Sequence, residues 1–179
     1  MELSSKLQDA IFPSLPLDLI QKNVVEIYCL VLQDDGNILP AMVIAASLAL
    51  ADAGVEVYDL VSAFSVAVIP KGLVDMQETD TGGEESLCKS HAGYCLLADP
   101  NAREVLAAES GGGVLTIAMM KSWREVVFWD QTGSLPSEVL GEAGELCREG
   151  CVTMHRFMRR ALVGDGVEEG DMDAIMQEQ

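Results

Sequence analysis

The most constraining feature of the sequence is the run from residue 23 to residue 53, NVVEIYCLVLQDDGNILPAMVIAASLALADA. Residues 24–32 are rich in β-branched and large apolar side chains, which predicts a strand buried on at least one face. The acidic, Gly-containing residues 33–37 predict a tight turn. Pro40 suits the first turn of a helix, and the Ala-rich residues 41–53 predict a helix that packs closely on a sheet. The rest of the chain is expected to be built around this unit.

Length and charge narrow the class of protein. The chain has 179 residues, enough for one domain with a hydrophobic core. Its 29 acidic and 11 basic residues give a net charge of −18. Such a chain is a poor candidate for binding nucleic acid alone, because that affinity comes largely from Lys and Arg. No apolar run reaches the roughly 18 residues of a membrane span, and the N-terminus lacks the pattern of a secretory signal.

Five cysteines are present: Cys29, Cys88, Cys95, Cys147 and Cys151. Their number is odd and none forms a CxxC motif, which suits a reducing compartment. The last two are four residues apart on an expected helix, so they share a face. A metal site that uses them with a nearby histidine is possible, but ordinary core packing is the favoured interpretation.

Hydrophobic periodicity and turn signals give the remaining elements. They are a helix at residues 2–12, strands at 61–69 and 94–98, a turn or short helix at 99–108, a hairpin of strands 114–120 and 125–130, and a long final helix that begins after Ser134 or Ser137. Residues 71–93 are expected to be a mobile insertion, and residues 164–179 an acidic, disordered tail. This order predicts an α+β fold with a mostly antiparallel sheet.

The final helix is expected to bury an apolar stripe of Val139, Ala143, Leu146, Gly150, Met154, Phe157 and Ala161. Near its C-terminus, Arg156, Arg159 and Arg160 either complement the helix dipole, the favoured interpretation, or form an RNA patch. The glycine run at residues 111–113 either cradles phosphate or gives flexible entry to a strand. The second is favoured, because the Lys-Ser/Thr of a phosphate-binding loop is missing.

Three stretches carry a resemblance to a known family: VLQDDGNILPAMVIAASLALADAG, DPNAREVLAAE and VLTIAMMKSWREVVFWDQTG. They resemble the LQxDG turn and ALADAG helix, the metal-binding segment and the last hairpin of the RNase PH family. Within it, the chain is most similar to eukaryotic RNA exosome ring subunits of the mRNA-transport-regulator type. The resemblance implies an RNase PH-like (ribosomal protein S5 domain 2-like) fold, with residues 1–163 as a partial domain that lacks the family's usual N-terminal portion.

The sequence departs from active members at decisive positions. Where they carry Gly-Thr-Arg to grip phosphate, this chain has Asn37, Ile38 and Leu39. Of the family's two metal-binding aspartates, the first matches Asp99 and the second falls on Val105. One carboxylate alone is a poor Mg²⁺ site. No catalytic, cofactor-binding or metal-binding residue is therefore assigned, and no cofactor is expected.

The resemblance thus implies a non-catalytic structural subunit of the exosome ring, supporting RNA processing and degradation by a separate nuclease. Its partners would be other RNase PH-like subunits, with RNA only in the context of the complex and no membrane. The location would be the nucleus and nucleolus, and also the cytoplasm. Two alternatives remain: an active phosphate-dependent 3′-exoribonuclease, or a truncated product that does not assemble. Without the family's N-terminal strands, an apolar face is expected to need a partner or to leave the fold marginally stable.

Overall fold

A computed structural model describes residues 2–16, 18, 24–71, 88–91 and 93–163. Its elements, in chain order, are helix α1 (Glu2–Ile11), the 3₁₀ turn η1 (Phe12–Ser14), helix α3 (Ile38–Asp52), strands β1 (Val61–Pro70), β2 (Cys88–His91) and β3 (Tyr94–Ala98), helix α5 (Ala102–Glu109), strands β4 (Gly113–Met120) and β5 (Glu125–Gly133), and helix α6 (Ser137–Val163). The predicted α+β class is confirmed, and so are the N-terminal helix, the Ala-rich helix, the last hairpin and the long final helix.

One antiparallel sheet holds the described strands in the order β2-β3-β1-β4-β5. Strand β1 is central: Val61 pairs with Met120 of β4, and Val66 pairs with Ala98 of β3 as well as Leu115 of β4. Both β1 and β4 are almost wholly buried, which fits their continuous apolar sequences.

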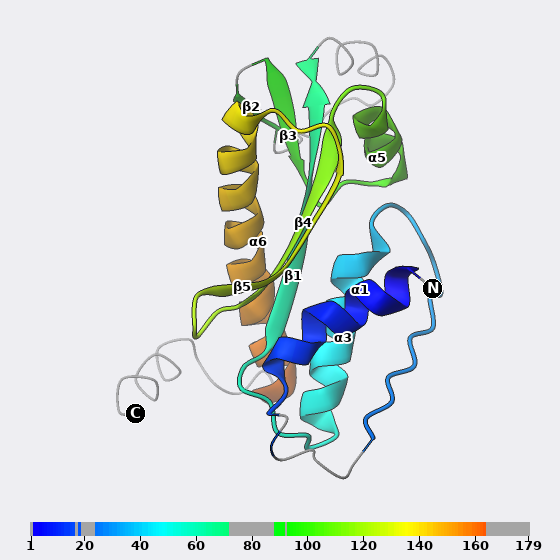
Figure 1. Cartoon of the computed structure of the whole chain (residues 1–179), viewed down its shortest axis with the longest axis vertical. Helices are drawn as coiled ribbons and strands as arrows, with labels where there is room; N and C mark the ends of the chain where they lie inside the picture. The colour runs from blue at the N-terminus through cyan, green and yellow to red at the C-terminus, as the bar shows by residue number, and fades with distance from the viewer. Residues whose placement is uncertain (1, 17, 19–23, 72–87, 92, 164–179) are drawn as a thin grey trace.

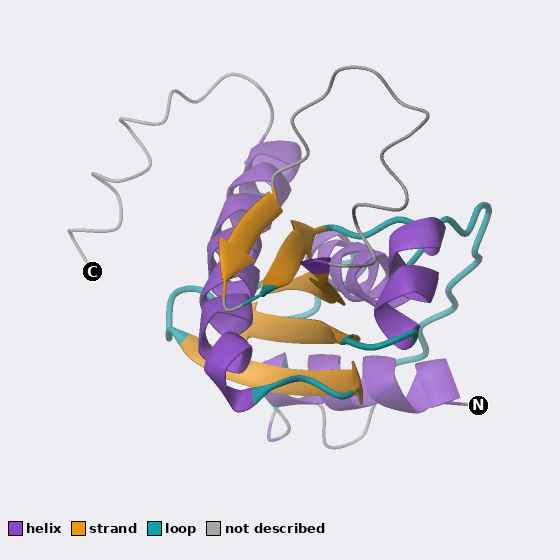
Figure 2. Cartoon of the chain, turned by 90° about the horizontal axis from the view of Figure 1, so that it is seen from above, coloured by secondary structure: helices purple, strands orange, loops and turns teal. Residues whose placement is uncertain are grey.

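Helices cover both faces of this sheet (Figures 1 and 2). Alternate residues of β1 point to opposite faces. Val66 and Val68 pack with the buried side of α6. Ala63 packs with α1 and α3, and Ala67 packs with α5. The chain therefore has three layers, with α6 on one side of the sheet and the other helices on the opposite side.

The expected strand at residues 24–32 is not part of this sheet. The segment is extended, pairs with no strand among the described residues, and has exposed side chains. Its apolar, β-branched composition suits a strand, yet a strand forms only when another strand accepts its hydrogen bonds. Among the described residues the edge strands of the sheet are β2 and β5, and neither is paired with residues 24–32. The prediction of a buried strand was wrong, although the extended conformation was right.

The expected insertion at residues 71–93 is only partly described. Strand β2 lies inside it and pairs with β3, with Ser90 opposite Cys95, so that part of the prediction was wrong. A four-residue strand in a polar stretch carries too weak a pattern to be recognised locally. Residues 72–87 and 92, and the tail at residues 164–179, lie outside the described residues.

Helix α6 buries a different stripe from the one expected. The buried positions are Val139, Ala143, Gly144, Leu146, Cys147, Cys151, His155 and Met158. Phe157 is exposed, so the predicted stripe is wrong in the second half of the helix. Gly150 remains close to the sheet, where an added Cβ would lie 2.3 Å from the ring of Phe64. Packing against the side chains of the sheet decides which face of the helix is buried, and the helix sequence alone does not specify that face.

The two α6 cysteines are core residues. The thiol of Cys147 donates to the carbonyl of Leu115 over 3.7 Å, and that of Cys151 donates to Ile117 over 3.5 Å. Burial raises the pKa of Cys151 to about 12, and burial together with neighbouring Cys151 raises the pKa of Cys147. This supports the packing interpretation. Cys95, by contrast, is disulfide-bonded.

Candidate functional site

Three of the positions that the sequence singled out, Asn37, Ile38 and Asp99, line one pocket. It has a volume of about 340 Å³ and lies between the turn that precedes α3 and the start of α5. Its lining residues are Gln33, Asp34, Asp35, Gly36, Asn37, Ile38, Ala41, Asp99, Pro100 and Asn101. A neighbouring pocket of about 220 Å³ shares Asp34 and Gly36 and adds Val105 from α5. The structure thus brings together two segments that are about 60 residues apart in the chain.

The turn and α5 are held in close contact by a glycine. Gly36 has a φ of +136°, a conformation that L side chains rarely adopt. A Cβ at this position would lie 2.3 Å from the carbonyl oxygen of Pro100. Opposite it, Asp99 also has a positive φ, of 53°, and its N–H donates to the carbonyl of Ser65 on β1 over 3.0 Å. The pocket is therefore shaped by close backbone approach of the turn to Pro100 and by the hydrogen bond from Asp99 to β1.

The N-terminus of α3 faces this pocket, but one of its N–H donors is already engaged by the N-cap side chain. Asn37 is the N-cap residue, and its side-chain oxygen accepts from the N–H of Leu39 over 3.2 Å. The amide nitrogen of the same side chain donates to Thr116 Oγ1 of β4 over 2.7 Å. Free N–H groups at a helix N-terminus bind anions, and this cap occupies one of them. The Leu39 side chain is buried in the core, with 2% of its surface exposed.

The N-terminus of α5 is closed in the same way. The side-chain oxygen of Asn101 accepts from the N–H groups of Arg103 and Glu104, over 3.0 and 3.1 Å. The carboxylate of Glu104 accepts from the N–H of Asn101 over 2.8 Å, which completes a capping box. Both helix starts that border the pocket are therefore capped by their own side chains.

The charges of the pocket also oppose an anion. Asp34, Asp35 and Asp99 all line it, and one oxygen of Asp34 accepts from the N–H of Gly36 over 3.3 Å. Carboxylates at the rim disfavour a phosphate by like-charge repulsion. Since no Lys or Arg stands among the described lining residues, no cationic side chain there offsets that repulsion.

The same residues do not fit a divalent cation. In the described ranges no three His, Cys, Asp or Glu side chains are arranged to hold a metal ion. Val105 is half-buried against the apolar cluster of Ala67 and Ile69, so it supplies no ligand where a second carboxylate would be needed. The family's metal and its phosphate therefore find no matching donor set here.

Two other candidate groups lie elsewhere. Arg156, Arg159 and Arg160 lie near the end of α6 and line neither pocket. The glycine run at residues 111–113 leads into β4, and a Cβ on Gly112 would lie 1.8 Å from the carbonyl oxygen of Val68. Close backbone packing explains Gly112 and Gly113 better than flexibility or phosphate binding.

Sequence reasoning missed the two caps. The Asn-x-x-Glu spacing of residues 101–104 is a readable signal for a capping box just before a helix. The hydrogen bond from Asn37 to Thr116 joins residues 79 positions apart, and no local sequence pattern predicts it.

Comparison with known proteins agrees with this architecture. The model of the 3' exoribonuclease family, domain 1, matches residues 1–56. The exosome complex component MTR3 of Mus musculus is 44% identical over 163 residues, which cover 90% of this chain and 51% of the mouse protein. The Homo sapiens MTR3 is 35% identical over 164 residues, covering 90% of this chain and 52% of that protein. The crystal structure of rice Rrp46 superimposes with a TM-score of 0.56 at 18% identity, covering 74% of this chain and 51% of the rice chain.

A sheet packed between helices, with an LQxDG turn set against a second short helix, defines the class of the fold, and the relatives identify the family. The chain belongs to the RNase PH family. It spans about half the length of the curated relatives that it matches. None of the helices in the described ranges combines the length and apolar character that crossing a membrane requires.

Proposed function

We propose that the chain is a non-catalytic structural subunit of the RNA exosome. In this role it helps to close a ring of RNase PH-like subunits, and a separate nuclease carries out the 3′-to-5′ processing and degradation of RNA, including rRNA processing and mRNA decay. The proposal extends to work in the nucleus and nucleolus, and also in the cytoplasm. The relatives support it, since the MTR3 proteins and the RRP41-like protein of Arabidopsis thaliana are exosome complex components by name.

The single observation that supports the non-catalytic part is the closed N-terminus of α3. Phosphorolysis requires an inorganic phosphate to be held and its charge neutralised. Here the Leu39 N–H is bonded to Asn37, Asn37 is bonded in turn to Thr116, and the Leu39 side chain is in the core. An anion would have to displace this cap while surrounded by carboxylates.

Net charge supports the assembly part. At −18, the chain repels RNA by itself but attracts positively charged neighbours. Electrostatic attraction of this kind raises the rate of association and favours unlike partners over a second copy of the same chain.

The test has two arms. In the first, the chain is incubated with labelled RNA, Mg²⁺ and phosphate, with an active phosphorolytic exoribonuclease as the positive control. We expect no release of nucleoside diphosphates, and release that scales with the chain's concentration would favour the enzyme. In the second arm, the chain is expressed with RNase PH-like exosome subunits. We expect it to co-purify in the ring, and its consistent absence would favour a product that does not assemble.

A double variant tests whether two substitutions are all that separates the site from activity. We expect Leu39→Arg with Val105→Asp to show no phosphorolysis, because Asn37 still caps α3 and the residue at position 39 starts from a buried position. The measurement is nucleoside diphosphate release under the conditions above. The single variant Val105→Asp is the control, because Val105 is only half-buried and its substitution disturbs the core less than that of Leu39. It should be equally inactive. Turnover by either variant would contradict the proposal.

A further inference from the structure

Two aromatic residues form an exposed pair at one end of the molecule. Trp123 lies in the β4–β5 turn, and Tyr58 lies in the loop between α3 and β1. Their ring centroids are 6.4 Å apart and their planes meet at 66°, which is an edge-to-face contact. Tyr58 is 57% exposed and Trp123 is 59% exposed. The two residues therefore touch each other and still leave more than half of their surface open.

The elements that carry this pair are joined beneath it. The carboxylate of Asp59, the residue after Tyr58, accepts from the N–H of Ser122, the residue before Trp123, over 2.7 Å. His155 of α6 places Nε2 3.6 Å from the same carboxylate. The loop, the turn and the second half of α6 thus meet at one point, in the lower half of Figure 1. This support fixes the pair in place, which lowers the entropy cost of binding a partner.

The same contacts bring basic residues to this end. Lys121 and Arg124 close the β4–β5 turn, where the N–H of Arg124 donates to the carbonyl of Lys121 over 3.1 Å. Arg156 and Arg159 follow His155 on α6. Arg159 comes four residues after His155 and therefore shares its face of the helix. The basic residues of two distant segments are thus gathered around the aromatic pair.

The local charge is the reverse of that of the whole chain. The described residues 53–61, 119–125 and 152–163 hold five bases, half of the ten in the described part of the chain, and only three acids. One of these acids is Asp59, which is already engaged by His155 and by backbone amides. Arg160, the fifth base, already interacts elsewhere in the chain. The remaining bases and the aromatic pair are here called the basic-aromatic surface: Tyr58, Lys121, Trp123, Arg124, Arg156 and Arg159.

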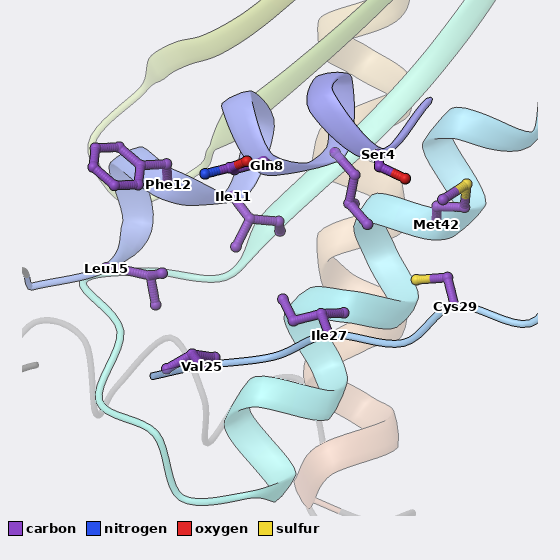
Figure 3. Close-up of a pocket in the computed structure, with 10 residues that line it drawn as sticks. Ser4, Gln8, Ile11, Phe12, Leu15, Val25, Ile27, Cys29 and Met42 are labelled. Atoms are coloured by element: carbon purple, nitrogen blue, oxygen red, sulfur yellow. The ribbon is translucent and has the colours of Figure 1, made fainter. Parts of the chain in front are cut away.

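The basic-aromatic surface is separate from the apolar pocket beside residues 24–32. That pocket has a volume of about 510 Å³, and Ile11, Val25 and Ile27 are among the residues that line it between α1, α3 and the extended segment (Figure 3). No residue of the basic-aromatic surface lines it. In addition, α6 packs on the opposite face of the sheet from α1 and α3. The basic-aromatic surface therefore does not depend on what pairs with residues 24–32.

We propose that the basic-aromatic surface is a docking site for an acidic segment of another protein, in which carboxylates flank an apolar side chain. Trp, Tyr and Arg are the residue types that contribute most binding energy at protein–protein interfaces. The apolar side chain of the partner packs on Tyr58 and Trp123. Its carboxylates pair with the surrounding bases, which supplies the charge complementarity that selects the partner.

The number and position of the charges favour a protein segment over RNA. A nucleic-acid-binding protein spreads its charge over roughly 6–10 phosphate contacts, and four bases fall short of that number. A polynucleotide would also extend over the acidic remainder of a chain whose net charge is −18. Since salt screens charges beyond about 8 Å, a short acidic segment responds to the nearby bases rather than to the whole chain.

The inference goes beyond the proposed exosome role and does not depend on it, so a chain that fails to enter the ring would still bind the probe. The probe is a dye-labelled peptide of about 12 residues in which Glu residues flank a central Leu-Pro-Phe. Fluorescence anisotropy measures its Kd for the full chain. We expect a Kd of about 10–100 μM at low salt. Binding should weaken by about fivefold or more when salt is raised from about 0.05 M to about 0.3 M.

Three control probes separate charge, apolar contact and RNA binding. A peptide with Lys in place of Glu should not bind, because it meets like charges. A peptide with Ser in place of the central Leu-Pro-Phe should bind about fivefold less tightly or worse, because it has nothing to pack on the aromatic pair. A labelled single-stranded oligouridine should bind less tightly than the acidic peptide.

Variants of the chain locate the binding site. We expect Trp123→Ala to weaken binding of the acidic peptide by about tenfold or more. The double variant Arg124→Gln with Arg156→Gln should weaken it by about fivefold at low salt. Leu106→Ala and Arg103→Gln, at exposed positions of α5, are the matched controls and should change the Kd by less than about twofold. Thermal unfolding checks that each variant folds, and the arginine variant decides if Trp123→Ala does not.

Four results would overturn the proposal. The first is no binding of the acidic peptide at chain concentrations up to about 1 mM. The second is an equal loss of affinity in the α5 controls. The third is tighter binding of oligouridine than of the acidic peptide, with dependence on Trp123, since the occupant would then be RNA. The fourth is sedimentation showing that a second copy of the chain covers the basic-aromatic surface.

Discussion

At the scale of single residues, three glycines decide how closely β1, β4 and β5 approach one another. A Cβ on Gly112 would lie 1.8 Å from the carbonyl oxygen of Val68, and one on Gly113 would lie 2.2 Å from that of Thr132. Gly133 has a φ of +80°, and a Cβ there would lie 2.4 Å from the carbonyl of Gly112. Each of these contacts is with backbone, which cannot move aside as a flexible side chain can.

We expect Gly112→Ala to lower the free energy of unfolding by about 1–3 kcal/mol, because the added methyl group forces β1 and the start of β4 apart. Urea denaturation followed by circular dichroism measures the change.

Gly141→Ala is the matched control, since Gly141 lies in the second turn of α6 and a Cβ there meets nothing within 4 Å. It should raise stability by about 0.5–1 kcal/mol through helix propensity. Equal effects of the two substitutions would show that close approach at Gly112 is unimportant.

At the scale of elements, Asp59 joins three parts of the fold. Its carboxylate accepts from the N–H of Leu60 over 2.9 Å and from the N–H of Ser122, in the β4–β5 turn, over 2.7 Å. His155 of α6 places Nε2 3.6 Å from the same carboxylate. Burial by itself would raise the pKa of Asp59, but His155 and the two amides outweigh it and hold the pKa below its ordinary value of 3.8.

This lowered pKa has a consequence for acid stability. A carboxyl group whose pKa is depressed by folding stabilises the folded state above its unfolded pKa, and the effect is lost as pH falls through the folded pKa. We expect Asp59→Asn to lose about 1–3 kcal/mol at pH 7, because hydrogen bonds to a charged group are removed. Below about pH 4 the difference between the variant and the parent chain should shrink.

Urea titrations at pH 7 and pH 3 measure both effects. Asp9→Asn, an exposed acid on α1, is the control and should change little at either pH. A difference between Asp59→Asn and the parent chain that grows on acidification would contradict the assignment.

At the scale of the whole molecule, the core consists of apolar clusters on both faces of one sheet. α6 covers the cluster on one face, and α1, α3 and α5 cover the clusters on the other. The last residues of α6 lie outside these clusters, and Leu162 and Val163 are 41% and 53% exposed. The described end of the chain therefore adds little to the core.

We accordingly expect deletion of residues 164–179 to leave the melting temperature nearly unchanged, because their acidic composition offers few apolar groups to bury. Thermal unfolding by circular dichroism measures this. The reference is a truncation within α6 that also removes residues 155–163, which takes away buried His155 and Met158 and should lower the melting temperature clearly. A fall of several degrees on deleting the tail alone would show that it is packed.

Much of the fold could be predicted from the sequence because its signals are local. Pro40 in a first helical turn, the alanines that follow it and the alternation of the last hairpin act within a few residues. The departures from the active pattern at Leu39 and Val105 remain predictions, which need only a local motif to compare with. The stripe of α6 was predicted correctly only in its first half, because the sheet decides which of two neighbouring faces is buried.

The sequence by itself determined which segments are helical and, apart from β2, which are extended. Tertiary structure alone decided that residues 24–32 pair with no strand among the described residues, that β2 joins β3, and that Asn37, the N-cap of α3, donates a hydrogen bond to Thr116. The physical reason is shared by all three. A hydrogen bond between distant parts of a chain forms only when packing has brought its donor and acceptor together, and no local pattern specifies that meeting.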